Sequence, residues 1–374
     1  MSIGDGQTVW ILGAGFSKSL GAPLLRDLFR QEVYGDLRKA IPEDLAARLT
    51  WSQALFNDGR DHAHLWEDAE DFLAYIEASY GNPSDLRKLR LLEGVLGRKH
   101  YMVIPSQPPT HLRLSDALLK ECLRDPPRTV RRALAAETSE FLRFTKITDE
   151  QWKPYEAWAK QLNPEWDAVI TFNYDTVLES LGDRFHAVLP SEVRKPGSGR
   201  VPVFKLHGSS DWIINASGGI ERDGEAVEKG ADIAIGAPGR GKASLTSTVL
   251  KPLWAEALSR LGYACGVAII GYGFPKTDAE ARMSLLAALE MNKGGAILRQ
   301  IELVLGPDVN LPDARRLLEL VRHRTGRETY VNNTQPPPPL SSKLMAGTRL
   351  ALVTQHPLWA EDFIGDYHRR TIVV

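Results

Sequence analysis

Four short apolar segments constrain the fold of this chain more than any other feature. They are 8–12 (TVWIL), 167–172 (DAVITF), 201–206 (VPVFKL) and 266–270 (GVAII). Nearly continuous β-branched runs of this kind are typical of parallel strands that are buried on both faces. Helical patterns follow three of them, at 24–34, 176–181 and 278–292. The sequence therefore predicts an α/β fold with a parallel sheet.

Glycine and polar residues stand directly after each of these segments. They are Gly13 and Gly15, Asn173 and Asp175, His207, and Gly271 and Gly273. In parallel α/β sheets the carboxyl ends of the strands meet at one edge, and ligands bind outside that edge. We therefore expect these residues to share one site.

The first of these turns lies in the stretch GAGFSKSLGAP (13–23) and begins like a dinucleotide-binding turn. Backbone N–H groups of residues 13–17 can face a diphosphate where no Cβ intervenes. A third glycine is expected three residues after Gly15, but Lys18 stands there. Asp36 has the spacing of a ribose-binding acid, but it follows a helical stretch and not a strand end. The pattern favours a nucleotide site that differs from that of a hydride-transferring dehydrogenase.

Asn173, Asp175 and His207 supply the polar chemistry at the other strand ends. An asparagine amide both donates and accepts hydrogen bonds, and a histidine can act as a general base near neutral pH. A lone histidine at a strand end is more often a packing residue. Beside a glycine turn and an asparagine, His207 is instead a candidate base.

Residues 36–159, between the first and second predicted strands, read mostly as helix. One segment, LWEDAEDFLAYIEASYG, has apolar residues at helical spacing: Leu65, Ala69, Phe72, Leu73 and Ile76. The segment is too long for a simple crossover between strands. We expect a helical subdomain at 36–159, inserted into a Rossmann-like domain formed by residues 1–35 and 160–330.

Two further segments are rich in glycine or proline. Residues 215–242 are expected to form a hairpin or a loose loop, and they contain GAPGRGKAS (236–244). This stretch is close to a phosphate-binding P-loop, but Ala243 stands where the magnesium-binding Ser or Thr belongs. Residues 331–374 are expected to form a proline-rich linker and a C-terminal extension with one strand, TRLALVT (348–354).

The composition excludes several classes of protein. The net charge of −1 gives no overall attraction to nucleic acid or to an anionic membrane, and direct nucleic-acid binding stays open through a basic cluster: Arg128, Arg131 and Arg132. Cys122 and Cys265 provide neither a disulfide framework nor a four-thiolate zinc site. No carboxylate cluster has metal-binding spacing, which argues against a nuclease. No membrane span or signal peptide is recognisable, so we expect a cytoplasmic protein.

Four motifs in one order resemble the signatures of the sirtuin fold: GAGFSKSLGAP, TFNYD, KLHGS and IIGYGF. They span about residues 8–278. The forms GAGFS, NYD, KLHGS and GYGFPKTD are most similar to those of the sirtuin-like proteins of bacterial antiphage defence. The resemblance implies a Rossmann-like parallel sheet with helices on both faces, the inserted helical subdomain, and NAD+ as the substrate, with no metal.

The chain departs from protein-deacylating sirtuins in two places. Those enzymes carry a four-cysteine zinc module after the His-Gly motif, whereas Cys265 is the only cysteine after His207 here. Where they carry Pro-Asp-Phe-Arg, this chain has Pro-Leu-Leu-Arg at 23–26, so the phenylalanine that shields the reactive sugar is missing. The missing zinc module argues against a deacylase, and the missing phenylalanine favours attack by water, and thus hydrolysis of NAD+ to ADP-ribose and nicotinamide.

The resemblance also assigns roles to residues. The residues that would bind the diphosphate and the nearby ribose are Gly13, Ala14, Gly15, Phe16 and Ser17. Asn173 would position water and the ribose hydroxyls, Asp175 would contact the nicotinamide carboxamide, and His207 would accept a proton. The adenosine side would be lined by Gly271, Tyr272 and Gly273. Pro23 and Arg26 would belong to a loop over the nicotinamide end.

An NAD+ hydrolase that acts without restraint harms its own cell. The resemblance therefore implies an effector of abortive infection that is controlled by a partner or by assembly. We expect a homo-oligomer with a separate partner, a HerA-type ring ATPase in the first place and an Argonaute-like protein in the second. Two alternatives stay open: an NAD-dependent protein deacylase, and a non-catalytic subunit that senses NAD+ or ADP-ribose for such a partner.

Overall fold

The predicted α/β fold is confirmed by a computed structural model of the chain. It describes residues 7–30, 43–61, 66, 68–80, 122, 125–193, 199–229, 231–236, 245, 248–275, 278–295, 298–325, 329–331 and 352–367. The proline-rich stretch and most of the GAPGRGKAS stretch lie outside these residues, so the structure does not test what the sequence predicts there.

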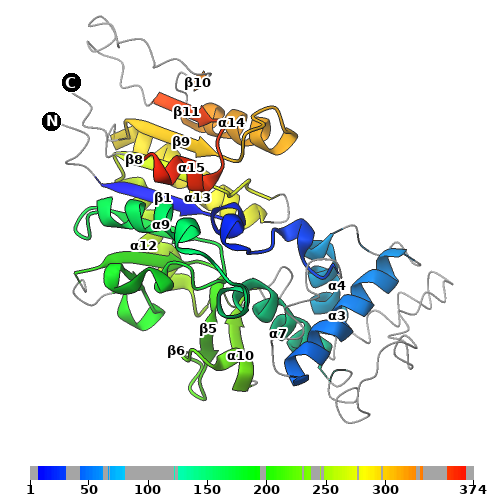
Figure 1. The fold of residues 1–374 in the computed structure, drawn as a ribbon. Helices are drawn as coiled ribbons and strands as arrows, with labels where there is room; N and C mark the ends of the chain where they lie inside the picture. Colours follow the sequence, from blue (N-terminus) through cyan, green and yellow to red (C-terminus); the bar gives the residue numbers. More distant parts are fainter. Residues whose placement is uncertain are drawn as a thin grey trace, which may run out of the picture.

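Eight strands form the main sheet, and every neighbouring pair is parallel. They are β1 (Thr8–Leu12), β2 (Ala168–Thr171), β3 (Phe185–Ala187), β4 (Val201–Lys205), β8 (Gly266–Ile270), β9 (Gln300–Val304), β10 (Thr329–Val331) and β11 (Leu352–His356). Their order across the sheet is β10-β11-β9-β8-β1-β2-β4-β3 (Figure 1).

The four strands predicted from the sequence are neighbours in this sheet, in the order β8-β1-β2-β4. In register, Trp10 of β1 is opposite Val169 of β2 on one side and Ala268 of β8 on the other. Every residue of β2 and β8 is buried. Because both faces of these strands are covered, their sequences are continuously apolar and do not alternate.

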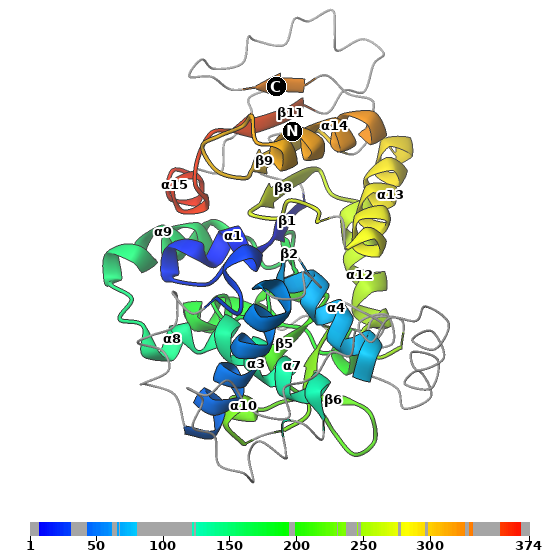
Figure 2. The ribbon, with the colours of Figure 1, turned by 90° about the vertical axis from the view of Figure 1, so that its right-hand side faces the viewer.

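Helices cover both faces of the sheet (Figure 2). One layer contains α1 (Ala14–Ser17), α9 (Asp149–Gln161) and α15 (Ala360–Gly365), and the other contains α12 (Lys251–Gly262), α13 (Ala279–Gly295) and α14 (Pro312–Thr325). In the first layer, Trp158 of α9 meets Trp10 of β1 edge to face, with ring centroids 5.3 Å apart. Large aromatic side chains of this kind supply much of the apolar area that the sheet buries.

A second hydrophobic core lies beyond the carboxyl edge of the sheet. Its helices are α3 (Glu43–Asp61), α4 (Ala69–Tyr80) and α7 (Pro126–Ser139). The predicted apolar face of α4 is buried there, at Ala69, Phe72, Leu73 and Ile76, whereas Leu65 lies outside the described residues. The helices inserted between β1 and β2 thus pack in a core separate from that of the main sheet.

A small antiparallel sheet shares this second core. Its strands are β5 (Gly208–Ile214), β6 (Ile220–Arg222) and β7 (Ile233–Ile235), in the order β6-β5-β7, with the short helix α10 (Ala226–Lys229) between β6 and β7. Within residues 215–242, where a hairpin or a loose loop was expected, the structure has β6 and β7, and each of them pairs with β5, which precedes this range. Val227, Ile233 and Ile235 join the helices of the core, so it extends beyond the predicted boundaries of the subdomain.

The C-terminal segment differs from the expectation. β11 lies between β9 and β10 in the main sheet, and Phe363 and Ile364 of α15 belong to the sheet core. Residues 352–367 are therefore part of the sheet domain, and the expected C-terminal extension does not hold for them. The helix α9 also begins within the predicted subdomain, yet Tyr155 and Trp158 are buried against the sheet. Hydrophobic periodicity shows that a helix has a buried face, but it does not show which core receives that face.

The remaining elements are short: α8 and four 3₁₀ helices. Their bounds are η2 Lys18–Leu20, η3 Leu25–Asp27, α8 Phe141–Phe144, η5 Glu179–Arg184 and η6 Pro190–Glu192. Within the part of the chain that the structure describes, no helix is both long enough and apolar enough to cross a membrane.

Candidate functional site

The four turns predicted to share a site lie next to one another at the carboxyl edge of the sheet. β8, β1, β2 and β4 are consecutive neighbours that run in the same direction. Gly271, Gly13, Asn173 and His207 follow the ends of these strands. The predicted convergence of the strand ends is therefore confirmed.

The glycine turns after β1 and β8 pack backbone against backbone. A Cβ on Gly13 would lie 2.5 Å from the carbonyl oxygen of Gly271, and one on Gly15 would lie 2.7 Å from the Gly271 Cα. The N–H of Gly13 donates to the Ile270 carbonyl (3.0 Å), and that of Gly15 donates to the Gly271 carbonyl (3.2 Å). Glycine is needed here because no side chain fits between the two turns. The expectation that these two N–H groups face a diphosphate does not hold, because both have acceptors within the protein.

Phe16 and Ser17, expected beside the diphosphate, are buried in the protein. The Phe16 ring meets Tyr155 and Trp158 edge to face, with centroids 5.1 and 5.4 Å away. Ser17 contributes its hydroxyl to the loop after β2, as described below. The N–H of Ala14, at the first position of α1, has no acceptor within its own helix. Among the backbone groups of this turn, Ala14 is thus the candidate for contact with a ligand.

Asn173 joins the turns that follow β1 and β2. Its side-chain Nδ2 donates to the carbonyl oxygen of Gly13 (3.1 Å) and to the hydroxyl oxygen of Ser17 (3.3 Å). Its backbone N–H donates to the Thr171 hydroxyl (3.1 Å). The side chain is partly exposed, so it is held in place and still accessible from the edge of the sheet.

Asp175 stabilises this loop from its buried side. Its carboxylate is buried and accepts a hydrogen bond from the Val177 N–H (3.1 Å). Burial raises the pKa of the Asp175 carboxyl above its ordinary value, although Lys205 and hydrogen bonds from Val177, Ser17 and Asn173 act to lower it. The carboxylate therefore orients Ser17 and Asn173. This placement gives Asp175 a supporting role and not the contact with a nicotinamide carboxamide that the resemblance implies.

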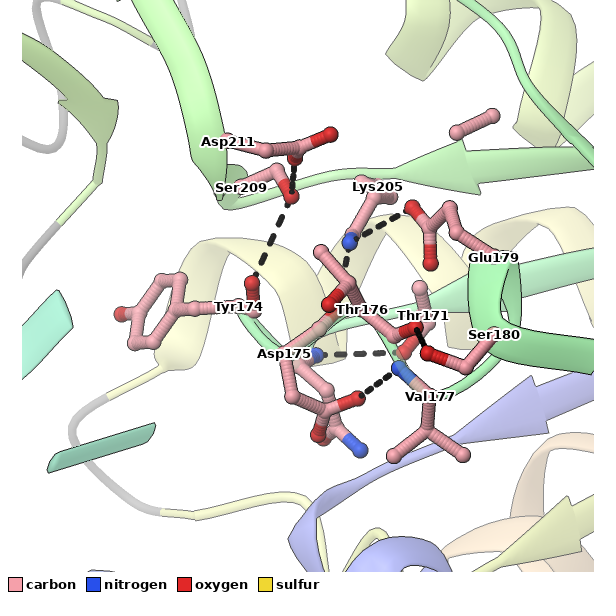
Figure 3. Close-up of polar contacts among 12 residues, drawn as sticks. Thr171, Tyr174, Asp175, Thr176, Val177, Glu179, Ser180, Lys205, Ser209 and Asp211 are labelled. Atoms are coloured by element: carbon pink, nitrogen blue, oxygen red, sulfur yellow. Dashed lines mark hydrogen bonds and ion pairs between the residues drawn. The ribbon is translucent and has the colours of Figure 1, made fainter. Parts of the chain in front are cut away.

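Lys205, which was not among the predicted site residues, lies against the same loop (Figure 3). Its side chain is 1% exposed, and Nζ donates to the Asp175 carbonyl (2.5 Å) and to Oε1 of Glu179 (2.9 Å). Burial alone would lower the pKa of Lys205, but the carboxylates of Glu179, Asp211 and Asp175 raise it above its ordinary value. A charged lysine thus ties β4 to the loop that carries Asn173. The signal in the sequence was a lysine within an otherwise apolar strand.

The turn between β4 and β5 places His207. Its next residue, Gly208, has a φ of +81°, and a Cβ there would lie 1.8 Å from the Ala234 carbonyl oxygen. The Ser210 N–H donates to the Tyr174 carbonyl (3.0 Å), which joins this turn to the loop after β2. The Ser209 hydroxyl lies 3.4 Å from the same carbonyl and closer to the Asp211 carboxylate (Figure 3). A glycine in the left-handed region and a cross-link between the loops hold His207 at a defined position.

His207 faces Asp278, a residue absent from the predicted site. The His207 Nε2 lies 3.2 Å from Oδ2 of Asp278, and the side chains are 8% and 3% exposed. The same Oδ2 accepts a hydrogen bond from the Tyr272 hydroxyl (2.9 Å). The two atoms are within ion-pair distance, and the interaction carries full charge only when the imidazole is protonated. Asp278 ends the motif GYGFPKTD, and that position was the available signal in the sequence.

Aromatic rings surround the His207 imidazole. Phe172 meets it edge to face at 4.8 Å and stacks on Tyr272 at 4.1 Å, with 7° between the planes. Burial raises the pKa of Tyr174 and of Tyr272, and the negative charges of Asp278 and Glu70 raise both further. The imidazole therefore lies in a region of low polarity, where charge interactions are stronger than in water.

Three further positions of the predicted site have different surroundings. Pro23 is buried, whereas the Arg26 side chain is 71% exposed and lies 3.8 Å from the Asp27 carboxylate. The carbonyl of Gly273 accepts a hydrogen bond from Arg316 of α14 (2.9 Å). Arg316 thus fixes the turn after β8, and nothing in the sequence near the motifs pointed to it.

Metal ligands were not expected from the sequence. Over the described ranges, no group of three or more His, Cys, Asp or Glu side chains is arranged to hold a metal ion.

Comparisons with known proteins do not assign the chain to a family. No family model matches its sequence, and no curated protein sequence matches it. One α/β fold of this type can carry many unrelated activities, so function has to be argued from the residues at the strand ends.

Proposed function

We propose that this chain is an NAD+ glycohydrolase that cleaves the bond between nicotinamide and ribose. The observation that carries the proposal is the convergence of Asn173 and His207 beside the glycine turn at one edge of a parallel sheet. A module that binds a nucleotide needs shape and hydrogen bonds. A partly exposed amide next to a histidine paired with a carboxylate adds what a hydrolytic reaction requires.

The order of the strands supports a dinucleotide as the ligand. β1 has β2 on one side and β8 on the other, so the chain runs outward from β1 in both directions. The crevice at such a reversal is where open α/β sheets bind their ligands. The diphosphate would lie over this point, near Ala14, with the nicotinamide ribose toward Asn173 and the adenosine toward Tyr272 and Gly273.

The reaction uses one water molecule. As the bond between the ring nitrogen and the anomeric carbon breaks, its electron pair leaves with nicotinamide, which departs neutral because the ring in NAD+ carries a positive charge. The oxygen of water bonds to the anomeric carbon, and the proton of that water passes to His207. Asn173 holds the ribose hydroxyls and the water in line. A positioned base contributes about 10²–10⁴-fold to such a step.

The motifs GAGFS, NYD, KLHGS and GYGFPKTD support an assignment to the sirtuin-like proteins of antiphage defence. Within this proposal the protein is a cytoplasmic, homo-oligomeric effector of abortive infection, restrained by assembly or by a partner. A HerA-type ring ATPase is the first candidate for the partner, and an Argonaute-like protein is the second.

The proposal is tested by incubating the purified protein with NAD+, with and without the product of the neighbouring gene, and separating the products by chromatography. We expect ADP-ribose and nicotinamide from the wild type and a turnover at least about 10²-fold lower from His207→Ala and from Asn173→Ala, with melting temperatures near that of the wild type. Wild-type rates in both variants would refute the proposal. O-acetyl-ADP-ribose formed from an acetylated peptide would identify a deacylase, and tight binding of NAD+ without turnover would identify a sensor.

A further inference from the structure

We infer that Asp278 is a positioning residue for His207, and that it directs the basic lone pair of the imidazole to Nδ1. The inference rests on the proposed function for its consequence in catalysis, but the geometry is independent of it. The buried Asp278 carboxylate lies 3.2 Å from Nε2 of His207 and comes from a different segment, at the start of α13. A carboxylate at one ring nitrogen favours a proton on that nitrogen, which leaves the other nitrogen as the base.

Asp278 is itself held in place. The Tyr272 hydroxyl donates to the carboxylate oxygen that faces His207 (2.9 Å). Tyr272 in turn stacks on Phe172, whose ring edge meets the imidazole, so the three side chains and His207 form one packed unit. Because the position of the carboxylate is fixed before a ligand binds, no rearrangement is needed when the imidazole gains a proton.

The other charged and titratable groups around His207 come from several elements. Tyr174 of the loop after β2 lies with its ring 6.4 Å from the imidazole. Glu70 of α4 acts on the hydroxyls of both Tyr174 and Tyr272, and Arg282 of α13 partly offsets it at Tyr272. Asp278 lies at ion-pair distance from the ring, and Glu70 is a second negative charge that acts on the two tyrosines beside it. The two carboxylates can therefore be separated by substitution.

The chemical step needs one ring nitrogen of His207 to hold a proton and the other to accept one. Neutral His207 accepts the proton of water or of a ribose hydroxyl at Nδ1 and becomes an imidazolium, with its second proton on Nε2 toward Asp278. The carboxylate stabilises the positive charge that forms on the ring. Loss of the carboxylate removes both effects: the ring can take the other tautomer, and its charged form is less stable.

The test compares Asp278→Asn with a matched control, Glu302→Gln. Glu302 of β9 pairs with His356 of β11, a second carboxylate–histidine pair that is largely shielded from solvent (14% and 11% exposed) and lies away from the turns after β1, β2 and β4. We expect Asp278→Asn to lower kcat for NAD+ hydrolysis on the order of 10²-fold with little change in KM. The acidic limb of the pH–rate profile should move to lower pH, since the imidazolium is no longer stabilised. Glu302→Gln should leave both quantities unchanged.

A second readout does not depend on activity. In ¹⁵N spectra of the folded proteins, we expect neutral His207 to carry its proton on Nε2 in the wild type and to show a mixture of tautomers in Asp278→Asn. Tyr272→Phe keeps the ring stack but removes the hydroxyl, and should give a smaller change in the same direction. If Asp278→Asn does not fold, Tyr272→Phe alone tests the positioning role by the same two measurements.

The outcomes separate this inference from the proposed function. If the wild type hydrolyses NAD+ and neither variant alters kcat or the tautomer, the positioning role is refuted while the function stands. If the wild type does not hydrolyse NAD+ but Asp278→Asn changes the tautomer, the function is refuted while the positioning role stands. Equal loss of kcat in Glu302→Gln and Asp278→Asn would also overturn the inference, because it would show a general effect of losing a buried carboxylate.

Discussion

The side-chain amide of Asn173 donates to the backbone carbonyl of Gly13 over 3.1 Å, and this bond ties the turn after β2 to the turn after β1. The same amide reaches the hydroxyl of the buried Ser17. One side chain therefore fixes the distance between the turn expected near a diphosphate and the loop expected near a ribose. Its partial exposure leaves it open to a ligand at the same time.

Substitution of Asn173 should affect activity more than stability. We expect Asn173→Ala to lower kcat for NAD+ hydrolysis about 10²–10³-fold, the usual cost of losing one oriented hydrogen-bonding group in an active site. The free energy of unfolding should fall by about 1–2 kcal/mol, because the Gly13 carbonyl and the Ser17 hydroxyl lose a donor. Product chromatography and urea unfolding measure the two effects. An unchanged kcat with normal folding would contradict a role for Asn173 in the reaction.

Lys205 should stabilise the loop after β2 in a way that depends on pH. We expect Lys205→Met to lower the free energy of unfolding by about 3 kcal/mol at pH 8, since it leaves the Glu179 carboxylate and the Asp175 carbonyl without their buried cation. Lys205 has a raised pKa, so in the wild type its stabilising charge is present below the ordinary lysine pKa and is lost only as the pH rises through the raised value. It is fully charged between pH 5 and pH 8.

The cost of Lys205→Met should decrease in acid. The pKa values of Asp175 and Glu179 are raised by burial, and Lys205 acts to lower both. A raised carboxyl pKa contributes stability that is fully present below the ordinary pKa and is lost as the pH rises through the raised pKa. Lys205→Met removes the positive charge, so it raises both carboxyl pKa values further. Urea unfolding at pH 5 and pH 8 should show the smaller loss at pH 5. Lys229→Met, at an exposed ion pair, is the control and should change neither value. An equal loss at both pH values would rule out this coupling.

The centre of the fold was predictable because its signal is local. β1, β2, β4 and β8 are largely apolar since both of their faces are covered, with Lys205 of β4 as the charged exception, and glycine or polar residues follow their ends. Parallel pairing alone then brings Asn173 and His207 to one edge. The sequence does not reveal in the same way that β11 enters the sheet beside β9, because this depends on a pairing between distant segments.

The details of the site depended on contacts that no motif encodes. Gly13 and Gly15 fit the pattern of a phosphate-binding turn, but their amides pair with the turn after β8. Asp175 has the spacing of a ligand-binding carboxylate, but burial makes it a support for Asn173. Lys205 acts through a side chain that reaches under a neighbouring loop, and such a reach is visible only in three dimensions.

Gly271 should be among the least replaceable residues of the chain. Its φ is +65°, and a Cβ there would lie 2.5 Å from the Phe16 nitrogen and 2.6 Å from the carbonyl carbon of Gly15. Gly218→Ala is the matched control, because Gly218 has a φ of +81° but open space around its Cβ position. We expect the control to cost roughly 1–2 kcal/mol through its backbone conformation. Gly271→Ala should cost at least about 2 kcal/mol more, because the two turns must separate. Equal losses in thermal unfolding would show that the turns do not pack as described.

Glu137 of α7 should control how firmly the segment after the first glycine turn is held. Its buried carboxylate accepts the backbone N–H of Phe29 through both oxygens (3.3 and 3.1 Å), and Phe29 is a buried non-glycine residue with a φ of +59°. A strained residue persists where its surroundings fix it. We expect Glu137→Gln to lower the free energy of unfolding by about 1–3 kcal/mol, since one of the two acceptor oxygens becomes a donor that faces a donor. Hydrogen exchange at the Phe29 amide should become faster by a larger factor than in the strands of the main sheet.

Thr138→Ala, on the same helix, is the control. It removes a hydroxyl that, among the described contacts, bonds only to carbonyls of its own helix, and it should leave exchange at Phe29 unchanged. If Glu137→Gln slowed NAD+ hydrolysis without faster exchange at Phe29, the carboxylate would act on the site by a route other than this anchor.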